Sequence, residues 1–328
     1  MGILEQDSNR RFVCMDPELR PYAQQQPAIP PVSAENLHAI REALKTFNRQ
    51  PLGIPHFDVA VEKRTIKGPP GAADVNIYLI NTTPGTCKPV IVHTHGGGFV
   101  LGEALDDVPD LKFFAAELDC AIITVDFRIA PEATFKQSIE ENYAALRWVY
   151  ENAAQIGVDS QRIAVMGESG GGGHAALLAL TARDRGEVPV ILQVLVYPML
   201  DDRTGSTRHP PFPIGSFVWP AESNRFGWRS FLGQEPGTDD VPRKAVPARY
   251  PDLAGLPPTF IAVGQTDLFV EESLEYARRL IDAAVLTELH VFPGAFHGFD
   301  YIAPQSRIAK DFLAARLTAL RRAFASTA

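Results

Sequence analysis

Cysteine is scarce in this sequence. The 328 residues include only three, Cys14, Cys87 and Cys120, and these lie far apart along the chain. An odd, widely spaced set gives neither a disulfide framework nor the ligand spacing of a metal site. We therefore expect free, reduced thiols, which are typical of a reducing compartment such as the cytoplasm.

Long hydrophobic runs and targeting signals are also missing. The longest apolar stretch, 188–200, is interrupted by Pro189, Gln193 and Pro198, and it is too short to cross a bilayer. Residues 1–10 are polar and lack the apolar centre of a signal peptide. These absences predict a soluble cytoplasmic protein without a membrane span.

Positive charge is sparse as well. No basic run is longer than two residues, and the formal net charge is −8. Nucleic-acid binding requires clusters of Lys and Arg that meet phosphates, so we expect no nucleic-acid partner. An acidic surface mainly favours solubility and does not identify a partner.

What the chain does contain is a strong α/β pattern. Residues 57–66 and 74–80 alternate with period two around the turn Gly68-Pro-Pro-Gly71, which predicts an antiparallel hairpin. The segments that follow alternate between short apolar runs, expected as buried strands, and helical patterns: strands at 90–92, 121–125, 163–166, 191–196 and 259–263, and helices at 107–118, 137–154 and 171–184. Buried strands that alternate with helices predict a mostly parallel sheet flanked by helices on both faces.

The pattern breaks at about residue 205. Residues 205–231 are rich in proline and aromatic residues, and no strand or long helix is obvious before Pro258. The α/β alternation then returns, with a helix near 271–283, a strand near 286–292 and a last helix near 305–325. We interpret the break as an insertion that sits over the sheet edge.

These observations predict how the chain is organised. The N-terminal segment looks helical in parts, with a helix start at Ser33-Ala-Glu-Asn36. The expected units are the N-terminal segment 1–50, a core in two parts, 51–204 and 232–328, and the insertion 205–231 between those parts.

One serine stands inside a glycine-rich turn. Gly167-Glu-Ser-Gly-Gly171 fits the pattern Gly-x-Ser-x-Gly between an apolar strand, 162–166, and a helix that includes 174–180. A serine hydroxyl is a weak nucleophile and must project clear of the backbone, next to a base and oxyanion donors. A tight strand-to-helix turn achieves this. The motif alone also fits a chance serine in a flexible turn, but the flanking strand and helix favour Ser169 as a nucleophile.

A second glycine motif, His95-Gly-Gly-Gly-Phe99, follows an earlier strand. Acyl transfer requires N–H donors aimed at the developing oxyanion, and a glycine loop can supply them because no side chain obstructs its amides. An ordinary glycine turn is the alternative. The Gly-Lys-Ser/Thr of a phosphate loop and the glycine spacing of a dinucleotide site are both absent, so we expect no cofactor.

An acid and a histidine follow the serine in the order that such a fold requires. Asp267 lies just past one buried strand, and His297 lies just past the next. The C-terminal ends of strands are where α/β sheets gather their sites. Each residue alone also fits a capping aspartate or a loop histidine. Their joint arrangement favours a base with an acid that orients it.

The sequence does not predict a metal site. His93 and His95 flank a single residue, which is a spacing that metal ligands can have. No acidic or cysteine cluster in the sequence completes a site around them, so we expect no metal.

Five motifs in this order resemble those of the hormone-sensitive-lipase-like carboxylesterases, the bacterial-type family IV of the α/β-hydrolase fold. The resemblance covers roughly residues 75–328 and rests on these stretches: His95-Gly-Gly-Gly-Phe99, Val125-Asp-Phe-Arg-Ile-Ala-Pro-Glu132, Gly167-Glu-Ser-Gly-Gly171, Asp267-Leu-Phe-Val-Glu-Glu272 and His297-Gly-Phe299. It implies an α/β-hydrolase fold with a mostly parallel central sheet and a mainly helical cap, formed by residues 1–50 and 205–231.

The resemblance also implies roles for individual residues. Ser169 is then the nucleophile, His297 the general base and acid, and Asp267 the residue that orients it. The amides of three glycines are implied as oxyanion donors: Gly97, Gly98 and Gly170. Family members are often dimers that pair near their last strand, here 286–292. Aromatic residues that we expect at the substrate pocket are Phe99, Trp219 and Phe226, although aromatic residues are more often part of a core.

Some positions depart from the family pattern. Glu168 stands where the family usually has aspartate, and we expect it to act from behind the site or at the surface. Gly170 stands where alanine is common, which suggests a looser turn. Glu271 and Glu272 are other acids close to Asp267. Gly172 and Gly173 lie outside the motif, and we expect close packing of the helix start against His95-Gly-Gly-Gly98 there.

Three hypotheses about function follow. The first is a serine carboxylesterase that hydrolyses small apolar esters, with short to medium acyl chains by family analogy, through an acyl-enzyme. The second keeps the triad but cleaves another bond, as an amidase, formamidase or lactonase. The third is a non-catalytic small-molecule receptor of the same fold, against which the complete motif around His297 argues.

Overall fold

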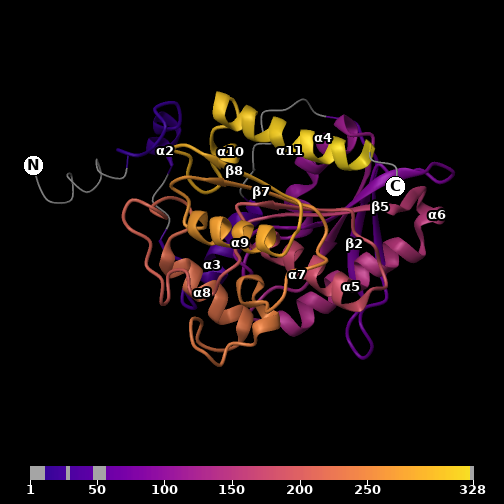
Figure 1. Ribbon diagram of the computed structural model, residues 1–328, viewed down its shortest axis with the longest axis horizontal. Coiled ribbons are helices and arrows are strands. Elements are labelled where there is room, and N and C mark those ends of the chain that lie inside the picture. Colours follow the sequence, from indigo (N-terminus) through magenta and orange to yellow (C-terminus); the bar gives the residue numbers. More distant parts are fainter. Residues whose placement is uncertain (1–11, 27–29, 47–56, 326–328) are drawn as a thin grey trace, which may run out of the picture.

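The computed structural model describes residues 12–26, 30–46 and 57–325 (Figure 1). One eight-stranded sheet runs through the molecule in the order β1-β2-β4-β3-β5-β6-β7-β8. The strands are β1 Val61–Ile66, β2 Val75–Ile80, β3 Lys88–Thr94, β4 Ala121–Asp126, β5 Val158–Glu168, β6 Leu192–Val196, β7 Thr259–Gly264 and β8 Thr287–Phe292. The predicted α/β-hydrolase architecture, a mostly parallel sheet flanked by helices, is confirmed.

The direction of the strands follows the sequence pattern. β1 and β2 form the predicted antiparallel hairpin, and β2 pairs antiparallel with β4. From β4 to β8 every neighbouring pair is parallel. In a parallel sheet all C-terminal strand ends lie at one edge, so the turns after β3, β5, β7 and β8 are brought together there.

Helices cover both faces of the sheet. They are α2 Arg20–Gln25, α3 Leu37–Thr46, α4 Val108–Glu117, α5 Phe135–Glu151, α6 Ala153–Ile156, α7 Gly170–Arg185, α8 Ala221–Leu232, α9 Val270–Asp282, α10 Phe299–Ile302 and α11 Arg307–Ala325, with short 3-10 turns η1 Ala104–Asp107, η2 Arg243–Ala245 and η3 Pro247–Arg249. α4 and α11 lie on one side of the sheet, and α5, α7 and α9 lie on the other (Figure 1). Each face has its own apolar core, because successive strand residues point to opposite sides.

The insertion contains a helix for which no periodic pattern was obvious in the sequence. α8 has 12 residues, and a mainly helical insertion is what the family resemblance implies. Its buried side includes Asn224, Trp228 and Phe231, which are spaced as a helix face requires. A glycine in the middle, Gly227, and the prolines before the helix hid this pattern.

The N-terminal segment lies against the core in two places. Val32 donates its backbone N–H to the Ser223 hydroxyl of α8 at 2.9 Å, and Asp16 donates to the Gly294 carbonyl at 3.1 Å. The predicted boundary at residue 50 lies in 47–56, outside the described residues. Among the described helices, none has the length and apolar character that crossing a membrane requires.

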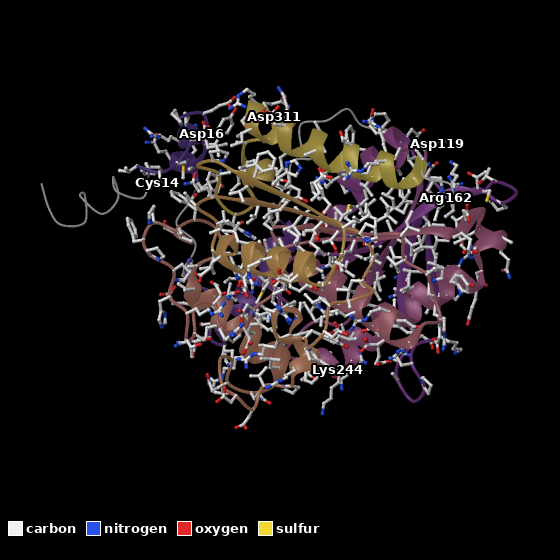
Figure 2. The ribbon with its side chains drawn as sticks, viewed as in Figure 1. Cys14, Asp16, Asp119, Arg162, Lys244 and Asp311 are labelled. Carbon is white, nitrogen blue, oxygen red and sulfur yellow. The ribbon has the colours of Figure 1, made fainter. Side chains whose placement is uncertain are left out.

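The three cysteines are all free thiols. Cys14 and Cys87 are exposed, and Cys120 is buried. Cys14 lies near the N-terminal end of the described chain, at the surface (Figure 2). Burial raises the pKa of the Cys120 thiol to about 12, so this side chain behaves as a small apolar residue.

Candidate active site

The turn that carries Ser169 joins β5 to α7. β5 ends at Glu168, α7 begins at Gly170, and Ser169 between them has φ 58° and ψ −120°. A non-glycine residue with positive φ costs on the order of 1–3 kcal/mol and persists only where its surroundings hold it. Here the Ser169 N–H donates to the Val196 carbonyl, and the Ser169 carbonyl accepts from the Met199 N–H, both at 2.9 Å.

The glycines after the serine allow close approach of the loop that contains Gly97 and Gly98. A Cβ on Gly170 would lie 2.9 Å from the backbone nitrogens of both Gly98 and Phe99. A Cβ on Gly171 would overlap the carbonyls of Thr94 and His95. The turn is therefore tightly packed at Gly170, and the expectation of a looser turn is wrong.

Gly172 and Gly173 have a different neighbour from the one expected. A Cβ on Gly172 would lie 2.8 Å from Pro198 Cβ, and a Cβ on Gly173 would meet the Met199 carbonyl and, at 3.1 Å, the Phe99 ring. These glycines pack mainly against the segment after β6. Gly170 and Gly171 are the glycines that pack against the loop after β3. Each residue of an α-helix is rotated by about a quarter-turn about the helix axis relative to the one before, so Gly172 and Gly173 face a different neighbour.

Ser169, His297 and Asp267 form one hydrogen-bonded chain. The Ser169 Oγ lies 2.9 Å from His297 Nε2, and His297 Nδ1 lies 2.8 Å from Asp267 Oδ2. If Nδ1–H donates to the carboxylate, Nε2 is left to accept the serine proton. The other Asp267 oxygen accepts from the Phe269 N–H at 2.9 Å, which fixes the carboxylate plane.

Aromatic rings hold the histidine in place. Tyr197 and Phe269 both lie edge-on to the His297 ring, with centroids 4.8 and 5.2 Å away. Asp267 is completely buried, and Ser169 and His297 are 8% and 6% exposed. Little water reaches the three groups, which strengthens their interactions.

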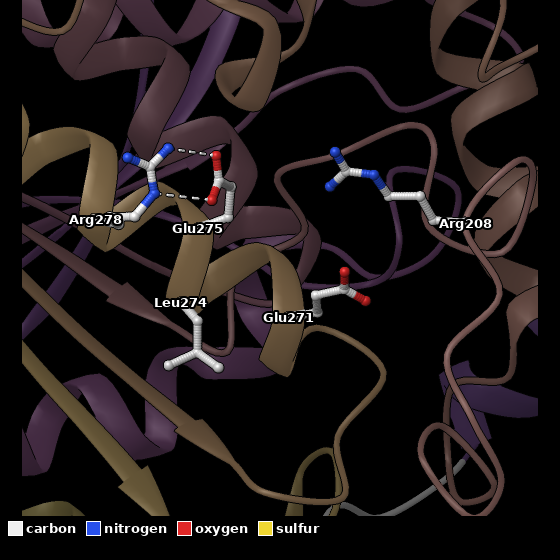
Figure 3. A pocket seen from close by; sticks show the side chains of 5 residues that line it. All are labelled: Arg208, Glu271, Leu274, Glu275 and Arg278. Carbon is white, nitrogen blue, oxygen red and sulfur yellow. Dashed lines mark hydrogen bonds and ion pairs between the residues drawn. The ribbon is translucent and has the colours of Figure 1, made fainter.

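The other acids near Asp267 have separate partners. Glu272 is buried, accepts from the Leu200 N–H at 2.6 Å and from Thr204 Oγ1, and its pKa is raised well above the usual range by burial. Glu271 is exposed and lines a surface hollow of about 490 Å³ (Figure 3). The other residues of this hollow are Arg208, Leu274, Glu275 and Arg278. Asp267 alone of these acids is paired with His297.

The glycine loop after β3 lies beside the serine. Gly97 and Gly98 have φ values of 118° and 57°, which glycine adopts without strain. A Cβ on Gly170 would lie 2.9 Å from the Gly98 nitrogen, so the loop lies directly beside the first residue after Ser169. Trp219 from the insertion packs on Gly98, where any Cβ would overlap its ring.

The three aromatic residues expected at the pocket have different surroundings. Phe99 lies in a buried aromatic cluster, stacked on Phe231 at 4.2 Å and edge-on to Trp228 at 4.9 Å. Trp219 is buried against the glycine loop, with its Nε1 3.2 Å from Asn224 Oδ1. Phe226 is partly buried against the core.

Sequence reasoning missed a buried polar group behind the turn. Glu168 is only 6% exposed; its Oε2 lies 2.8 Å from His93 Nε2, and its Oε1 accepts from Arg316 Nη1 at 2.9 Å. Glu168 therefore lies behind the site and not at the surface. Burial is the strongest single influence on His93 and opposes its protonation, but the charge and hydrogen bond of Glu168 together with the charge of Asp107 outweigh it, so the pKa of His93 is raised.

The same place contains ligand types that suit a metal. His93, Asp107 and Glu168 bring one ligand atom each to within 4.8 Å of one another, which the sequence did not indicate. Both oxygens of Glu168 already have protein partners, and one of these is a guanidinium. These three side chains thus belong to an ion-pair network, and a divalent cation would have to displace the existing partners of Glu168. The residues therefore do not fit a resident metal.

Comparisons with known proteins identify the family to which the chain belongs. A family described as having the alpha/beta hydrolase fold matches residues 91–301. The chain belongs to this family. Two esterases of Mycobacterium tuberculosis are similar to it: esterase LipI is 33% identical over 300 residues, covering 86% of this chain and 91% of that protein, and carboxylesterase NlhH is 32% identical over 302 residues, covering 89% and 91%.

Solved structures are similar over almost the whole chain. A structure titled bacterial heroin esterase has a TM-score of 0.86 at 36% identity and covers 96% of this chain and 99% of that one. Esterase LipW from Mycobacterium marinum has a TM-score of 0.81 at 34% identity and covers 95% and 97%. This α/β hydrolase is thus a hormone-sensitive-lipase-like member and a carboxylic ester hydrolase.

Proposed function

We propose that this α/β hydrolase is a serine carboxylesterase that works through an acyl-enzyme on Ser169. The observation that carries the proposal is the unbroken hydrogen-bonded chain from Ser169 through His297 to Asp267, at a strained strand-to-helix turn. Nucleophile, base and orienting acid within hydrogen-bond reach are the signature of an activated serine.

Each side chain then has a defined task. His297 Nε2 takes the proton of Ser169 as Oγ attacks the ester carbonyl, and it gives that proton to the departing alcohol. Water that is activated by the same nitrogen then releases the acid. Asp267 keeps Nδ1 protonated and stabilises the imidazolium that forms at each step.

The oxyanion of each tetrahedral intermediate is proposed to accept hydrogen bonds from the amides of Gly97, Gly98 and Gly170. Support comes from the closeness of Gly98 N to Gly170 and from the position of Gly170 at the start of α7. A helix N-terminus favours negative charge. Loss of one such donor typically lowers kcat by about 10²- to 10³-fold.

The proposed substrates are small apolar esters with short to medium acyl chains. Aromatic side chains crowd the surroundings of the triad: Phe217 lies 5.4 Å from Phe296, the neighbour of His297, and Trp219 covers Gly98. Phe99, Trp219 and Phe226 remain our candidates for pocket residues. An apolar lining favours an apolar acyl group and disfavours charged substrates.

The segments 1–50 and 205–231 are proposed to form the cap over this pocket. Within the described residues, Val32 hydrogen-bonds to Ser223, and the Phe12 and Phe217 rings lie 5.4 Å apart. The two segments therefore meet each other beside the loop that carries His297.

We further propose a homodimer that pairs through 286–292 and a cytoplasmic location. β8, at 287–292, is an edge strand of the sheet, and within the described residues no strand pairs with its outer side. An exposed edge can pair with a second copy. The location is supported by three unpaired thiols, two of them exposed.

A set of p-nitrophenyl esters tests the proposed chemistry. The acetate, butyrate, octanoate and palmitate are compared as substrates of the wild type and of Ser169→Ala. We expect kcat/KM to be highest for the acetate or butyrate and to disappear in Ser169→Ala. Wild-type turnover by Ser169→Ala would sink the proposal, and a matched set of ester, anilide and lactone substrates would reveal an amidase or a lactonase.

A further inference from the structure

A second group of charged side chains lies behind the catalytic turn, and the proposed hydrolysis does not use it directly. Glu168 precedes Ser169 and turns toward the face of the sheet that α11 covers, where it pairs with Arg316 at 2.9 Å. Arg316 is 1% exposed, and its guanidinium carbon lies 4.3 Å from the centroid of the Phe114 ring. Two charges have thus been removed from water directly under the nucleophile.

The same helix also supports the catalytic histidine. Phe312 lies four residues before Arg316 on α11, and residues four apart share a helix face. The Phe312 ring stacks on Tyr197 with centroids 5.9 Å apart, and Tyr197 in turn lies edge-on to His297. One face of α11 therefore lies behind both the nucleophile and the base.

Arg316 links these two contacts. The Tyr197 hydroxyl donates to Asp300 Oδ1 at 3.1 Å. The guanidinium carbon of Arg316 lies 5.8 Å from the centroid of the Phe312 ring, so Arg316 borders the ring that stacks on Tyr197 as well as Glu168. Glu168, Arg316, Phe312 and Tyr197 thus form a chain of contacts from the residue before Ser169 to the ring beside His297.

Stability alone does not account for this chain. Burying an ion pair costs desolvation energy that often cancels the attraction, and apolar residues of similar volume would fill the space equally well. The ion pair holds the Glu168 side chain in one orientation and thereby restrains its backbone. The next residue is Ser169, whose strained backbone conformation depends on such restraint.

We propose that Arg316 is a positioning residue for the hydrolysis, acting on Ser169 through Glu168 and on His297 through Phe312 and Tyr197. This inference rests on the proposed triad. Small misplacements of reacting groups lower rates by about 10²-fold. Loss of Arg316 should therefore lower kcat, because the groups that it positions act after the substrate has bound.

The test compares Arg316→Met and Arg316→Lys with Arg321→Met, a control on the same helix whose side chain is half exposed and pairs with Glu117. Active sites are counted with a fluorophosphonate, and kcat and KM for p-nitrophenyl butyrate are expressed per titrated site. We expect Arg316→Met to lower kcat per site by about 10- to 100-fold, with KM changed by less than about threefold. Arg316→Lys should lie between Arg316→Met and the wild type, because it keeps the charge but not the planar fork, and Arg321→Met should match the wild type.

A double variant separates positioning from folding. Glu168→Gln with Arg316→Met removes the carboxylate whose Oε1 loses its partner in the single variant, so its thermal stability should recover toward the wild type while kcat per site stays low. If Arg316→Met does not fold, this double variant supplies the measurement.

Two results would overturn the inference: wild-type kcat per site in the folded variants that lack Arg316, or recovery of kcat together with stability in the double variant. A wild type that is not labelled at Ser169 would instead refute the triad itself, so the two failures can be told apart.

Discussion

Ser169 illustrates how single residues carry this site. Its positive φ is held by backbone hydrogen bonds to Val196 and Met199, and its hydroxyl reaches His297. A hydroxyl presented in this way is pre-oriented for attack before the substrate arrives, which lowers the entropic part of the barrier.

Gly170 should tolerate no side chain without loss of rate. In Gly170→Ala the new Cβ would press on the nitrogens of Gly98 and Phe99 at 2.9 Å, and the glycine loop would have to shift. We expect kcat for p-nitrophenyl acetate to fall about tenfold, with little change in KM. The fall should be smaller than the one caused by complete loss of an oxyanion donor, because the donors are displaced and not removed. A wild-type kcat in this variant would mean that the loop does not supply the oxyanion donors.

Glu272 should make stability depend on pH in a defined direction. Its folded-state pKa is raised above the unfolded value, so the folded state binds the proton more tightly and stability falls as pH rises from about 4 toward the folded-state pKa. Glutamine can keep the contacts with the Leu200 amide and Thr204 without this loss.

The free energy of unfolding of Glu272→Gln should therefore rise relative to that of the wild type as pH increases. The gain is about 1.4 kcal/mol for each pH unit between the unfolded-state and the folded-state pKa of Glu272. Urea unfolding at pH 5 and pH 8 measures this gain, and Glu271→Gln, at the exposed neighbouring position, serves as the control. The same stability difference from the wild type at both pH values would contradict the assignment of a raised pKa to Glu272.

At the scale of elements, the insertion packs against the glycine loop. Trp219, just before α8, packs on Gly98, and Gly227 within α8 approaches the Gly98 carbonyl so closely that no Cβ would fit. The insertion thus lies against the same loop that we propose as the oxyanion donor. Its contacts explain why a proline-rich segment adopts an ordered structure here.

Truncation of the tryptophan tests this role. Trp219→Ala should lower kcat/KM for p-nitrophenyl butyrate by at least about tenfold, because the glycine loop loses its cover and water enters. Trp148→Ala on α5, where the ring is partly buried and borders Arg64, should leave kcat/KM unchanged. Equal activities of both variants and the wild type would show that Trp219 only fills space.

Elements with a clear period were predictable from the sequence, and contacts between distant residues were not. The hairpin and the buried strands have apolar patterns that can be recognised within a few residues. Ser169, Asp267 and His297 could be predicted because each lies just past the end of a predicted strand. α8 was missed because Gly227 and the aromatic side chains obscure its periodicity. The pairing of Glu168 with Arg316 spans 148 residues, and no local pattern contains it.

At the scale of the whole molecule, the two edges of the sheet offer a direct comparison. Val291 on β8 and Val61 on β1 are each 37% exposed, on opposite edge strands. Lysine on an edge strand opposes strand pairing. If two copies pair through β8, Val291→Lys should therefore convert the dimer to a monomer, as measured by light scattering. Val61→Lys, on the other edge strand, should leave the dimer intact. A wild type that is monomeric, or a Val291→Lys variant that remains a dimer, would refute this interface.

All hydrolysis by this enzyme is proposed to pass through one hydroxyl, that of Ser169. The decisive measurement combines fluorophosphonate labelling with peptide mass spectrometry and with the residual rate of p-nitrophenyl butyrate hydrolysis. We predict that the label is found on Ser169, at one per chain, and that activity falls in proportion to labelling. Full hydrolysis by protein that is completely labelled at Ser169, or a label on another residue that accounts for the lost activity, would contradict the account.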